Sequence, residues 1–192
     1  MKIVILQGMT CLGKSTLGNK LSTELDNCKY LSLDKYKEDM WDKHGFDSVE
    51  QRNQLNETAR KLFYEDVDTV IENKSYNYLI IDYVFNEKLW NELMEHVIDK
   101  GIDLITIYLK PKDMQEHRKA WELRSRDFSI RHAGHGATHY HNGVGTEYVN
   151  RYDTKIFDSL HVTNKVIEVY VSFSPYSTSV SYEDILDYVK MT

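Results

Sequence analysis

The sequence has little cysteine and little proline, with two of each in 192 residues. Two cysteines, Cys11 and Cys28, do not make the disulfide framework of a small secreted domain, so we expect a reducing, cytoplasmic location. With two prolines and no repeat or low-complexity tract, the chain shows no linker. We therefore predict one domain over residues 1–192, a length that suits a single full core.

Long apolar runs and excess positive charge are also lacking. No run approaches the roughly 18 residues that a membrane helix needs, and Met1 leads into a short apolar run with no signal-peptide pattern. Asp and Glu number 30 against 24 Lys and Arg, which gives a formal net charge of -6. This balance disfavours a general nucleic-acid binder, which needs a basic face. We expect a small-molecule partner and no membrane contact.

Short apolar runs alternate with longer helical patterns. Strands are expected at 3–6, 30–33, 79–81, 104–109 and 166–171, and helices at 15–25, 55–71, 89–98, 113–126 and 182–189. Gly101 is predicted as the C-cap glycine of the helix over 89–98. Strands that are apolar throughout and alternate with helices form parallel sheets covered on both faces. We predict a three-layer α/β fold with a five-stranded parallel sheet, typical of P-loop NTPases.

A glycine-rich motif follows the first expected strand. "GMTCLGKS" matches G-x-x-x-x-G-K-[ST] without a mismatch, between a strand and a helix. Glycines let several backbone N–H groups point at one phosphate, and the helix adds its positive end. Lys14 is predicted to bridge the β- and γ-phosphates catalytically, and Ser15 to ligate Mg²⁺. The predicted ligands are ATP and Mg²⁺, with the nucleotide bound by Gly8, Met9, Thr10, Cys11, Leu12, Gly13, Lys14, Ser15 and Thr16.

Two acidic residues follow expected strands, at the sheet edge where ligands bind in such folds. In "LSLDKY", Asp34 is predicted as the general base that accepts the proton of an attacking hydroxyl, or as the N-cap of the next helix, or as both. In "LIIDYVF", Asp82 is predicted as the acid that holds the Mg²⁺ shell, with a substrate-facing role or a purely structural role left open.

A charged segment over 113–146 is predicted as a lid. Its arginines are Arg118, Arg124, Arg126 and Arg131. Phosphoryl transfer builds negative charge on the γ-phosphate, which lid arginines stabilise as they exclude water. Arg126 and Arg131 are the predicted catalytic pair, while Glu116 and Glu122 are expected to pair with other arginines of the helix.

The lid ends in a segment rich in glycine and histidine. Its histidines are His132, His135, His139 and His141. Their spacing raises the possibility of zinc, but no cysteine or well-placed acid completes a site. We expect a flexible loop in which histidines bind phosphate or sugar, with at least some of them serving only as polar loop residues. After the last strand, "SFSPYSTSVS" is expected to lie against the nucleotide base through backbone groups, Pro175 or Tyr176.

This combination of motifs resembles the small P-loop kinases. That group includes chloramphenicol phosphotransferase, zeta-toxin-like kinases and the 5'-kinase domain of polynucleotide kinase. The resemblance implies that Asp34 is the base and that Arg126 and Arg131 contact ATP phosphates. "RHAGH" is similar to an R-H-P-G-H lid motif of uncharacterised members, with Ala133 at the proline position. The chain lacks D-G-[FY]-P-R and D-R-[SHY] after the third strand, which disfavours adenylate-kinase-like and thymidylate or deoxynucleoside kinases.

Three functions are compatible with these motifs. The first is an ATP-dependent kinase that phosphorylates a hydroxyl of a nucleoside, sugar nucleotide or antibiotic. The second is a polynucleotide 5'-hydroxyl kinase, which the acidic balance disfavours. The third is a nucleotide-binding regulatory module without acceptor chemistry. Asp34 distinguishes the first from the third, because only a phosphotransferase needs a base there.

Overall fold

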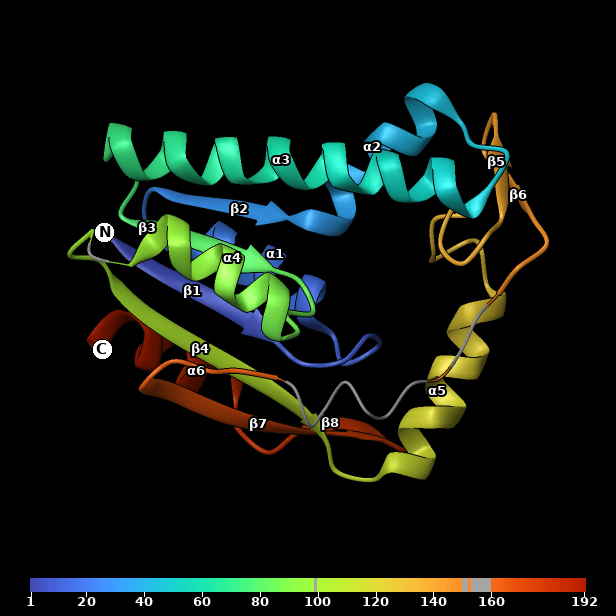
Figure 1. The fold of residues 1–192 in the computed structure, drawn as a ribbon. Helices are drawn as coiled ribbons and strands as arrows, with labels where there is room; N and C mark the ends of the chain where they lie inside the picture. Colours follow the sequence, from blue (N-terminus) through green and yellow to red (C-terminus); the bar gives the residue numbers. More distant parts are fainter. Residues whose placement is uncertain (99, 150–151, 153–159) are drawn as a thin grey trace.

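The computed structural model describes residues 1–98, 100–149, 152 and 160–192. Six strands form its main sheet (Figure 1). Their order across the sheet is β2 (Cys28–Ser32), β3 (Tyr78–Asp82), β1 (Lys2–Gln7), β4 (Asp103–Pro111), β7 (Lys165–Phe173) and β8 (Tyr176–Thr178). The first five are parallel, as predicted. The sixth, β8, pairs antiparallel with β7, so the loop after the last predicted strand is a short hairpin.

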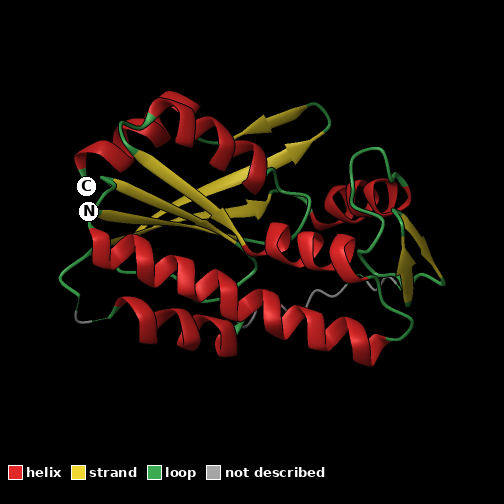
Figure 2. Ribbon diagram, turned by 90° about the horizontal axis from the view of Figure 1, so that it is seen from above, coloured by secondary structure: helices red, strands yellow, loops and turns green. Residues whose placement is uncertain are grey.

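Helices cover both faces of this sheet, which confirms the predicted three-layer fold (Figure 2). In β1, Ile3 and Ile5 pack on the face covered by α3 (Val49–Asn73) and α4 (Glu87–Val97). Val4 and Leu6 pack on the other face, under α1 (Lys14–Glu24) and α6 (Tyr182–Met191). Both faces of β1 are apolar because successive strand residues point to opposite sides and both sides are buried.

Several helices begin where the sequence supplies a capping side chain. Ser48, Asn86, Asp113 and Ser181 each accept a hydrogen bond from a backbone N–H of the first helical turn. The predicted cap at the other end of α4 is wrong. Ile98 caps this helix through its N–H to the Met94 carbonyl, and Gly101 lies three residues beyond with φ of 65°.

The predicted lid, residues 113–146, contains α5 (Met114–Arg126) and a hairpin of β5 (His139–His141) and β6 (Val144–Thr146). Both lie beyond the carboxyl ends of the strands (Figure 1). The hairpin docks on α2 (Leu33–His44) and the turn after it, because Phe46 and Tyr140 exchange backbone hydrogen bonds of 2.8 and 2.7 Å. Trp41, Phe46, Ala137 and Tyr140 form a buried cluster there. A segment predicted as a flexible loop therefore shares a buried core with α2 and the turn after it.

In the described part of the chain, no helix is both long and apolar enough to cross a bilayer.

Candidate active site

The phosphate loop joins β1 to α1 and needs glycine at two positions. Gly8 has φ of 135°, and a Cβ there would lie 2.4 Å from the Leu109 carbonyl oxygen. Gly13 has φ of 84°, and a Cβ there would lie 2.6 Å from the Tyr176 hydroxyl. Other residues rarely adopt these φ values, and at Gly8 the backbone of Leu109 also leaves no room for a side chain. The two motif glycines are therefore required by the loop itself.

Lys14 is the first residue of α1, and its side chain folds back into the loop. The residue is 8% exposed, and its Nζ donates to the carbonyl oxygens of Gly8, at 3.0 Å, and Met9, at 2.8 Å. Burial lowers the pKa of Lys14, against the opposing effect of the carboxylates of Asp82 and Asp34. The ammonium group is thus held within the loop that the sequence predicts to bind phosphate.

Asp82, at the end of β3, receives two hydroxyl groups. Ser15 Oγ donates to Asp82 Oδ2 over 2.7 Å, and Tyr30 OH donates to the same oxygen over 2.8 Å. Asp82 is 3% exposed, so these bonds compensate for the burial of its charge. The structure brings together the two residues predicted for Mg²⁺. A hydroxyl and a carboxylate are the hard oxygen donors that Mg²⁺ requires, so the pair fits this ion.

Asp34 lies within a helix, whereas the sequence analysis expects it directly after a strand. β2 ends at Ser32, which is also the N-cap residue of α2, and Asp34 is the second residue of that helix. The alternative prediction of Asp34 as the N-cap is therefore wrong. Lys37, one turn along, places its Nζ 3.5 Å from Asp34 Oδ1. Burial alone would raise the pKa of Asp34. The positive charges of Lys37, His135 and Lys14 outweigh burial and hold the pKa below its ordinary value. The carboxylate is thereby kept in the form that accepts a proton.

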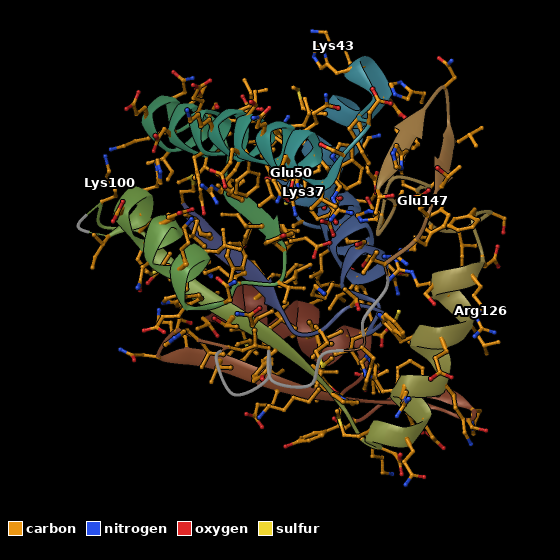
Figure 3. All side chains as sticks on the ribbon, turned by 45° about the vertical axis from the view of Figure 1, so that its right-hand side comes forward. Lys37, Lys43, Glu50, Lys100, Arg126 and Glu147 are labelled. Carbon is orange, nitrogen blue, oxygen red and sulfur yellow. The ribbon has the colours of Figure 1, made fainter. Side chains whose placement is uncertain are left out.

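The lid arginines separate into two groups. Arg124 Nη1 lies 3.6 Å from Cys11 Sγ, and Arg124 lines the hollow of the phosphate loop. Arg131 lines the cleft beside it, and burial and Arg124 lower the pKa of its guanidinium. Arg126 is exposed on the outer side of α5 (Figure 3), away from this hollow. Residues two apart on a helix point roughly 200° apart, so Arg124 and Arg126 cannot both face the loop. The structure thus brings Arg124, rather than the predicted Arg126, to the phosphate loop.

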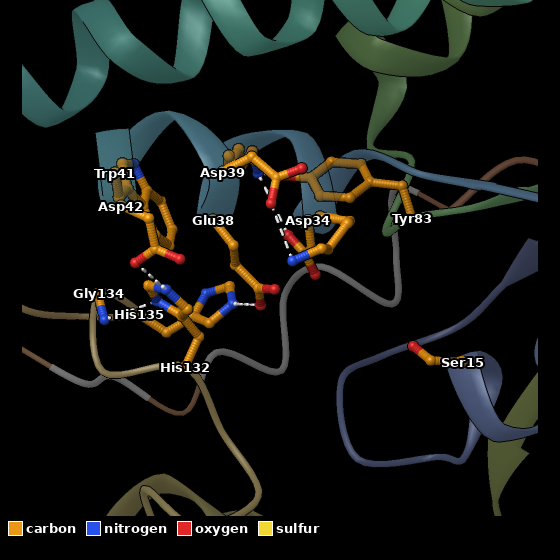
Figure 4. Close-up of polar contacts among 12 residues, drawn as sticks. Ser15, Asp34, Glu38, Asp39, Trp41, Asp42, Tyr83, His132, Gly134 and His135 are labelled. Atoms are coloured by element: carbon orange, nitrogen blue, oxygen red, sulfur yellow. Dashed lines mark hydrogen bonds and ion pairs between the residues drawn. The ribbon is translucent and has the colours of Figure 1, made fainter. Parts of the chain in front are cut away.

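The lid histidines contact carboxylates. His132 Nε2 lies 3.0 Å from Asp42 Oδ1, and His135 Nε2 lies 2.9 Å from Glu38 Oε1 (Figure 4). His141 and His139 have similar contacts with Asp47, at 2.7 Å, and Glu147, at 3.6 Å. No group of three potential ligands that could hold a metal ion occurs among the described residues. The first three contacts tie the lid to α2 and to the turn after it. His135 also lines the cleft next to the phosphate loop, and the binding of phosphate or sugar by these histidines stays a prediction.

Two connected hollows open at Asp34. One, of about 310 Å³, is lined by phosphate-loop residues, Asp82 and Arg124. The other, of about 400 Å³, extends from the loop toward α2, α3 and the lid. Its lining residues are Met9, Thr10, Asp34, Lys37, Trp41, Arg52, Asn56, Tyr83, Val84, Trp121, Arg131, His135, Gly136, Val149 and Tyr152. Asp34 lines both, so it lies where the contents of the two hollows would meet. We call the larger hollow the acceptor cleft.

A third, mostly apolar hollow of about 190 Å³ lies on the far side of the loop. It is lined by Gly13, Thr16, Leu17, Lys20, Leu109, Val169, Tyr176, Thr178, Tyr182 and Ile185. The predicted base-side contact Tyr176 belongs to it, at the start of β8. Pro175 does not line it. A flat apolar group on a phosphate chain fits this position, next to the start of α1.

His117 is a buried residue of this region that the sequence analysis misses. It is 0% exposed on α5, with Nε2 2.9 Å from the Thr10 carbonyl oxygen and Nδ1 2.8 Å from the Tyr152 hydroxyl. Because the carbonyl only accepts, Nε2 carries the proton and Tyr152 donates to Nδ1. Burial lowers the pKa of His117. The residue thus connects the lid helix to the phosphate loop, and nothing in its charged sequence surroundings indicates this.

No protein-family model and no curated protein matches the chain. Several solved structures do. A candidate kinase from Chloroflexus aurantiacus superposes with a TM-score of 0.72 at 20% identity, covering 99% of this chain and 97% of that chain. The APS kinase of Mycobacterium tuberculosis, in complex with AMPPNP and APS, gives 0.51 at 14% identity, with 99% and 95% coverage. A sugar kinase from a Janibacter species gives 0.51 at 11% identity, with 88% and 85% coverage.

The chain therefore shares its α/β fold with these solved structures. At these identities the likeness establishes the fold, and the residues of the site carry the argument about function.

Proposed function

We propose that the protein is an ATP-dependent phosphotransferase that moves the γ-phosphate of ATP to a hydroxyl of a small molecule. The position of Asp34 carries this proposal. Its carboxylate lines both the phosphate-loop hollow and the acceptor cleft. A base at this junction meets the acceptor hydroxyl as it attacks the phosphate, which is where a kinase needs one. A module that only binds nucleotide needs neither the base nor the cleft.

In this mechanism the protein supplies position and charge. Lys14 and the backbone N–H groups of the loop hold the phosphates. Asp34 accepts the proton of the acceptor hydroxyl. Arg124 and Arg131 stabilise the negative charge that develops during transfer and exclude water from the cleft. The Tyr176 side of the loop receives the base of the nucleotide.

Ser15 and Asp82 are the residues that would hold Mg²⁺. The bound ion would neutralise charge on the phosphate oxygens. The Tyr30 hydroxyl donates a hydrogen bond to Asp82 and would thereby orient its carboxylate for the metal ion.

The structural neighbours support the same reaction class. Each of the three is named as a kinase or candidate kinase, and the structure of one contains AMPPNP. Because these neighbours differ in their named substrates, they leave the acceptor of this chain open.

Transfer of labelled γ-phosphate from ATP and Mg²⁺ into a fractionated metabolite extract tests the proposal. We would compare the wild type with Lys14→Ala and Asp34→Asn. We expect a labelled small molecule that both variants lose, with a fall of about 10²–10⁴ in rate for Asp34→Asn. ATP binding, followed by calorimetry, is expected to persist in Asp34→Asn.

Normal transfer by Asp34→Asn would exclude its role as the base. An unlabelled extract together with intact ATP binding would contradict the proposal. Labelling of an oligonucleotide with a 5'-hydroxyl end would then favour the polynucleotide kinase, and its absence the regulatory module.

A further inference from the structure

The acceptor cleft has the opposite charge to the protein as a whole. The chain carries a formal charge of -6. Among the described residues that line the cleft, Asp34 is the single carboxylate, while Lys37, Arg52 and Arg131 are cations. A cleft lined mainly by one sign of charge focuses the field, and low-dielectric walls strengthen it. The cleft is therefore suited to a negatively charged ligand.

The three cations have different neighbours. Lys37 Nζ contacts Asp34 and also donates to the Tyr83 hydroxyl, so its charge is shared with the base. Arg131 also lines the hollow that contains Arg124 and Cys11, close to the phosphate loop. Arg52 lines only the acceptor cleft among the hollows around the loop. Arg52 is thus the cation that has no place in the transfer chemistry.

Arg52, in the first turns of α3, is half-buried. Its Nη1 donates to the Ala137 carbonyl oxygen over 2.6 Å. Within residues 1–98, 100–149, 152 and 160–192, no carboxylate lies within ion-pair distance of it. A guanidinium group has five N–H donors in a planar fork, so several remain for a ligand. Partial burial of a cation without a counter-ion is unfavourable, and burial lowers the pKa of Arg52. A bound anion would remove this cost.

Asn56, one turn further along α3, adds a donor beside it. Its Oδ1 accepts from Trp41 Nε1 over 3.0 Å. This bond fixes the orientation of the amide, so the amide NH₂ faces away from Trp41. Arg52 and Asn56 lie four residues apart on α3, on the same side of the helix, and both line the acceptor cleft.

We propose that the acceptor is an alcohol that already carries an anionic group of the phosphate type, bound by Arg52 and Asn56, with its free hydroxyl at Asp34. This inference rests on the proposed function and specifies its substrate class. A planar guanidinium can donate two parallel N–H bonds to two oxygens of a phosphate group, whereas a neutral sugar offers it no countercharge. A cavity of about 400 Å³ has the size for a phosphorylated sugar or nucleoside.

Binding of matched probes tests the inference. The nucleotide site is first saturated with AMPPNP and Mg²⁺, and the intrinsic fluorescence of Trp41 and Trp121 reports the cleft. The probes are pairs that differ only in a phosphate: ribose and ribose 5-phosphate, glucose and glucose 6-phosphate, and each nucleoside with its 5'-monophosphate. We expect the phosphorylated member to bind at least about tenfold more tightly in one or more pairs, as one charged hydrogen-bonded contact supplies.

The variant Arg52→Gln is expected to remove this preference, and Arg52→Lys to retain part of it through charge alone. Arg60→Gln is the matched control, because Arg60 lies on the same helix but pairs with Glu57 and Glu92. If Arg52→Gln fails to fold, Arg52→Lys and Asn56→Ala provide the comparison. Equal affinity within every pair would overturn the inference, as would an unchanged preference in all Arg52 and Asn56 variants.

The two proposals fail in different ways. Phosphorylated probes that bind through Arg52 but never receive phosphate from ATP would overturn the proposed function and leave the anionic site standing. Transfer to neutral alcohols alone, with phosphorylated ones excluded, would overturn the anionic site and leave the phosphotransferase standing.

Discussion

Ser15 and Asp82 lie 67 positions apart in the chain, yet Ser15 Oγ donates to Asp82 Oδ2 over 2.7 Å. The parallel pairing of β1 with β3 allows this contact, because Asp82 ends β3 and Ser15 lies just after the loop that follows β1. Tyr30, on β2, donates to the same carboxylate oxygen. Hydroxyl groups from α1 and β2 thus converge on the buried carboxylate at the end of β3.

Asp82→Asn tests the role of this carboxylate. An amide of the same shape retains the packing but loses the charge that would hold Mg²⁺. We expect Mg²⁺ affinity in the presence of ATP to fall on the order of 100-fold, with the fold retained. Titration of Mg²⁺ against ATP binding measures this. Tyr30→Phe, which removes one hydrogen bond and keeps the charge, is the control. Equal Mg²⁺ dependence in wild type and Asp82→Asn would show that Asp82 has a purely structural role.

Arg124 and Arg126 provide a matched pair on one helix. Arg124 lines the phosphate-loop hollow, while Arg126 is exposed on the outer side of α5. We expect Arg124→Gln to lower kcat/KM for phosphate transfer by at least about 100-fold. The negative charge that develops on the transferred phosphate would lose the guanidinium group that stabilises it. Arg126→Gln is expected to stay within about twofold, as for a surface substitution. A larger loss in Arg126→Gln than in Arg124→Gln would contradict the assignment.

The sheet and the phosphate loop could be predicted because local sequence determines them. Fully apolar runs such as 3–6 are buried on both faces, and the glycines of the loop occupy positions where the backbone excludes a side chain. The choice between Arg124 and Arg126 was beyond the sequence. Both belong to one charged helix, and only the contact with Cys11 shows which side of that helix faces the loop.

Residues that act through distant contacts were also missed. His117 is surrounded in sequence by charged residues, and its burial depends on Thr10 and Tyr152. The histidine-rich segment has loop-like composition, but Trp41 and Phe46 supply a core that lies some ninety residues earlier in the chain. Such pairings depend on topology, and composition carries no signal for them.

His117 makes stability depend on pH. Burial lowers its pKa from 6.5, so the native state binds fewer protons than the unfolded state. Stability from this group is present above the unfolded pKa and is lost as the pH falls through the folded pKa. We expect His117→Gln to lower the free energy of unfolding at pH 8 by about 1–3 kcal/mol, because two buried hydrogen bonds change. Denaturant titration measures this difference. The difference from wild type should shrink below about pH 6.5. A constant difference between pH 8 and pH 5 would contradict this.

Asp34 sets a limit on the pH dependence of activity. Its pKa lies below the ordinary value of 3.8, so the carboxylate is already the base at every pH above that value. We expect kcat/KM to show no acid-side loss from Asp34 between about pH 5 and pH 8. In Asp34→Glu, residual activity is expected to keep the same flat profile at a lower level. A protonation step near neutral pH that disappears in the Asp34 variants would show that burial outweighs the nearby cations.

Gly134 holds the lid against α2. A Cβ at this position would lie 2.5 Å from Trp41 Cε3. Trp41 has little freedom to move, because it is 3% exposed and its Nε1 donates to Asn56.

We expect Gly134→Ala to destabilise the protein by about 1–3 kcal/mol through overpacking, and to speed tryptic cleavage between residues 124 and 131. Gly143→Asn is the control, since nothing lies within 4 Å of that position and asparagine tolerates its φ of 82°. Trp41 lines the acceptor cleft and contacts the ring of His135, which also lines it. A shift of Trp41 in Gly134→Ala should therefore also weaken acceptor binding while ATP binding persists. Wild-type melting and cleavage rates in Gly134→Ala would mean that the lid leaves α2 freely in solution, and the cleft would then be assembled only when its ligands bind.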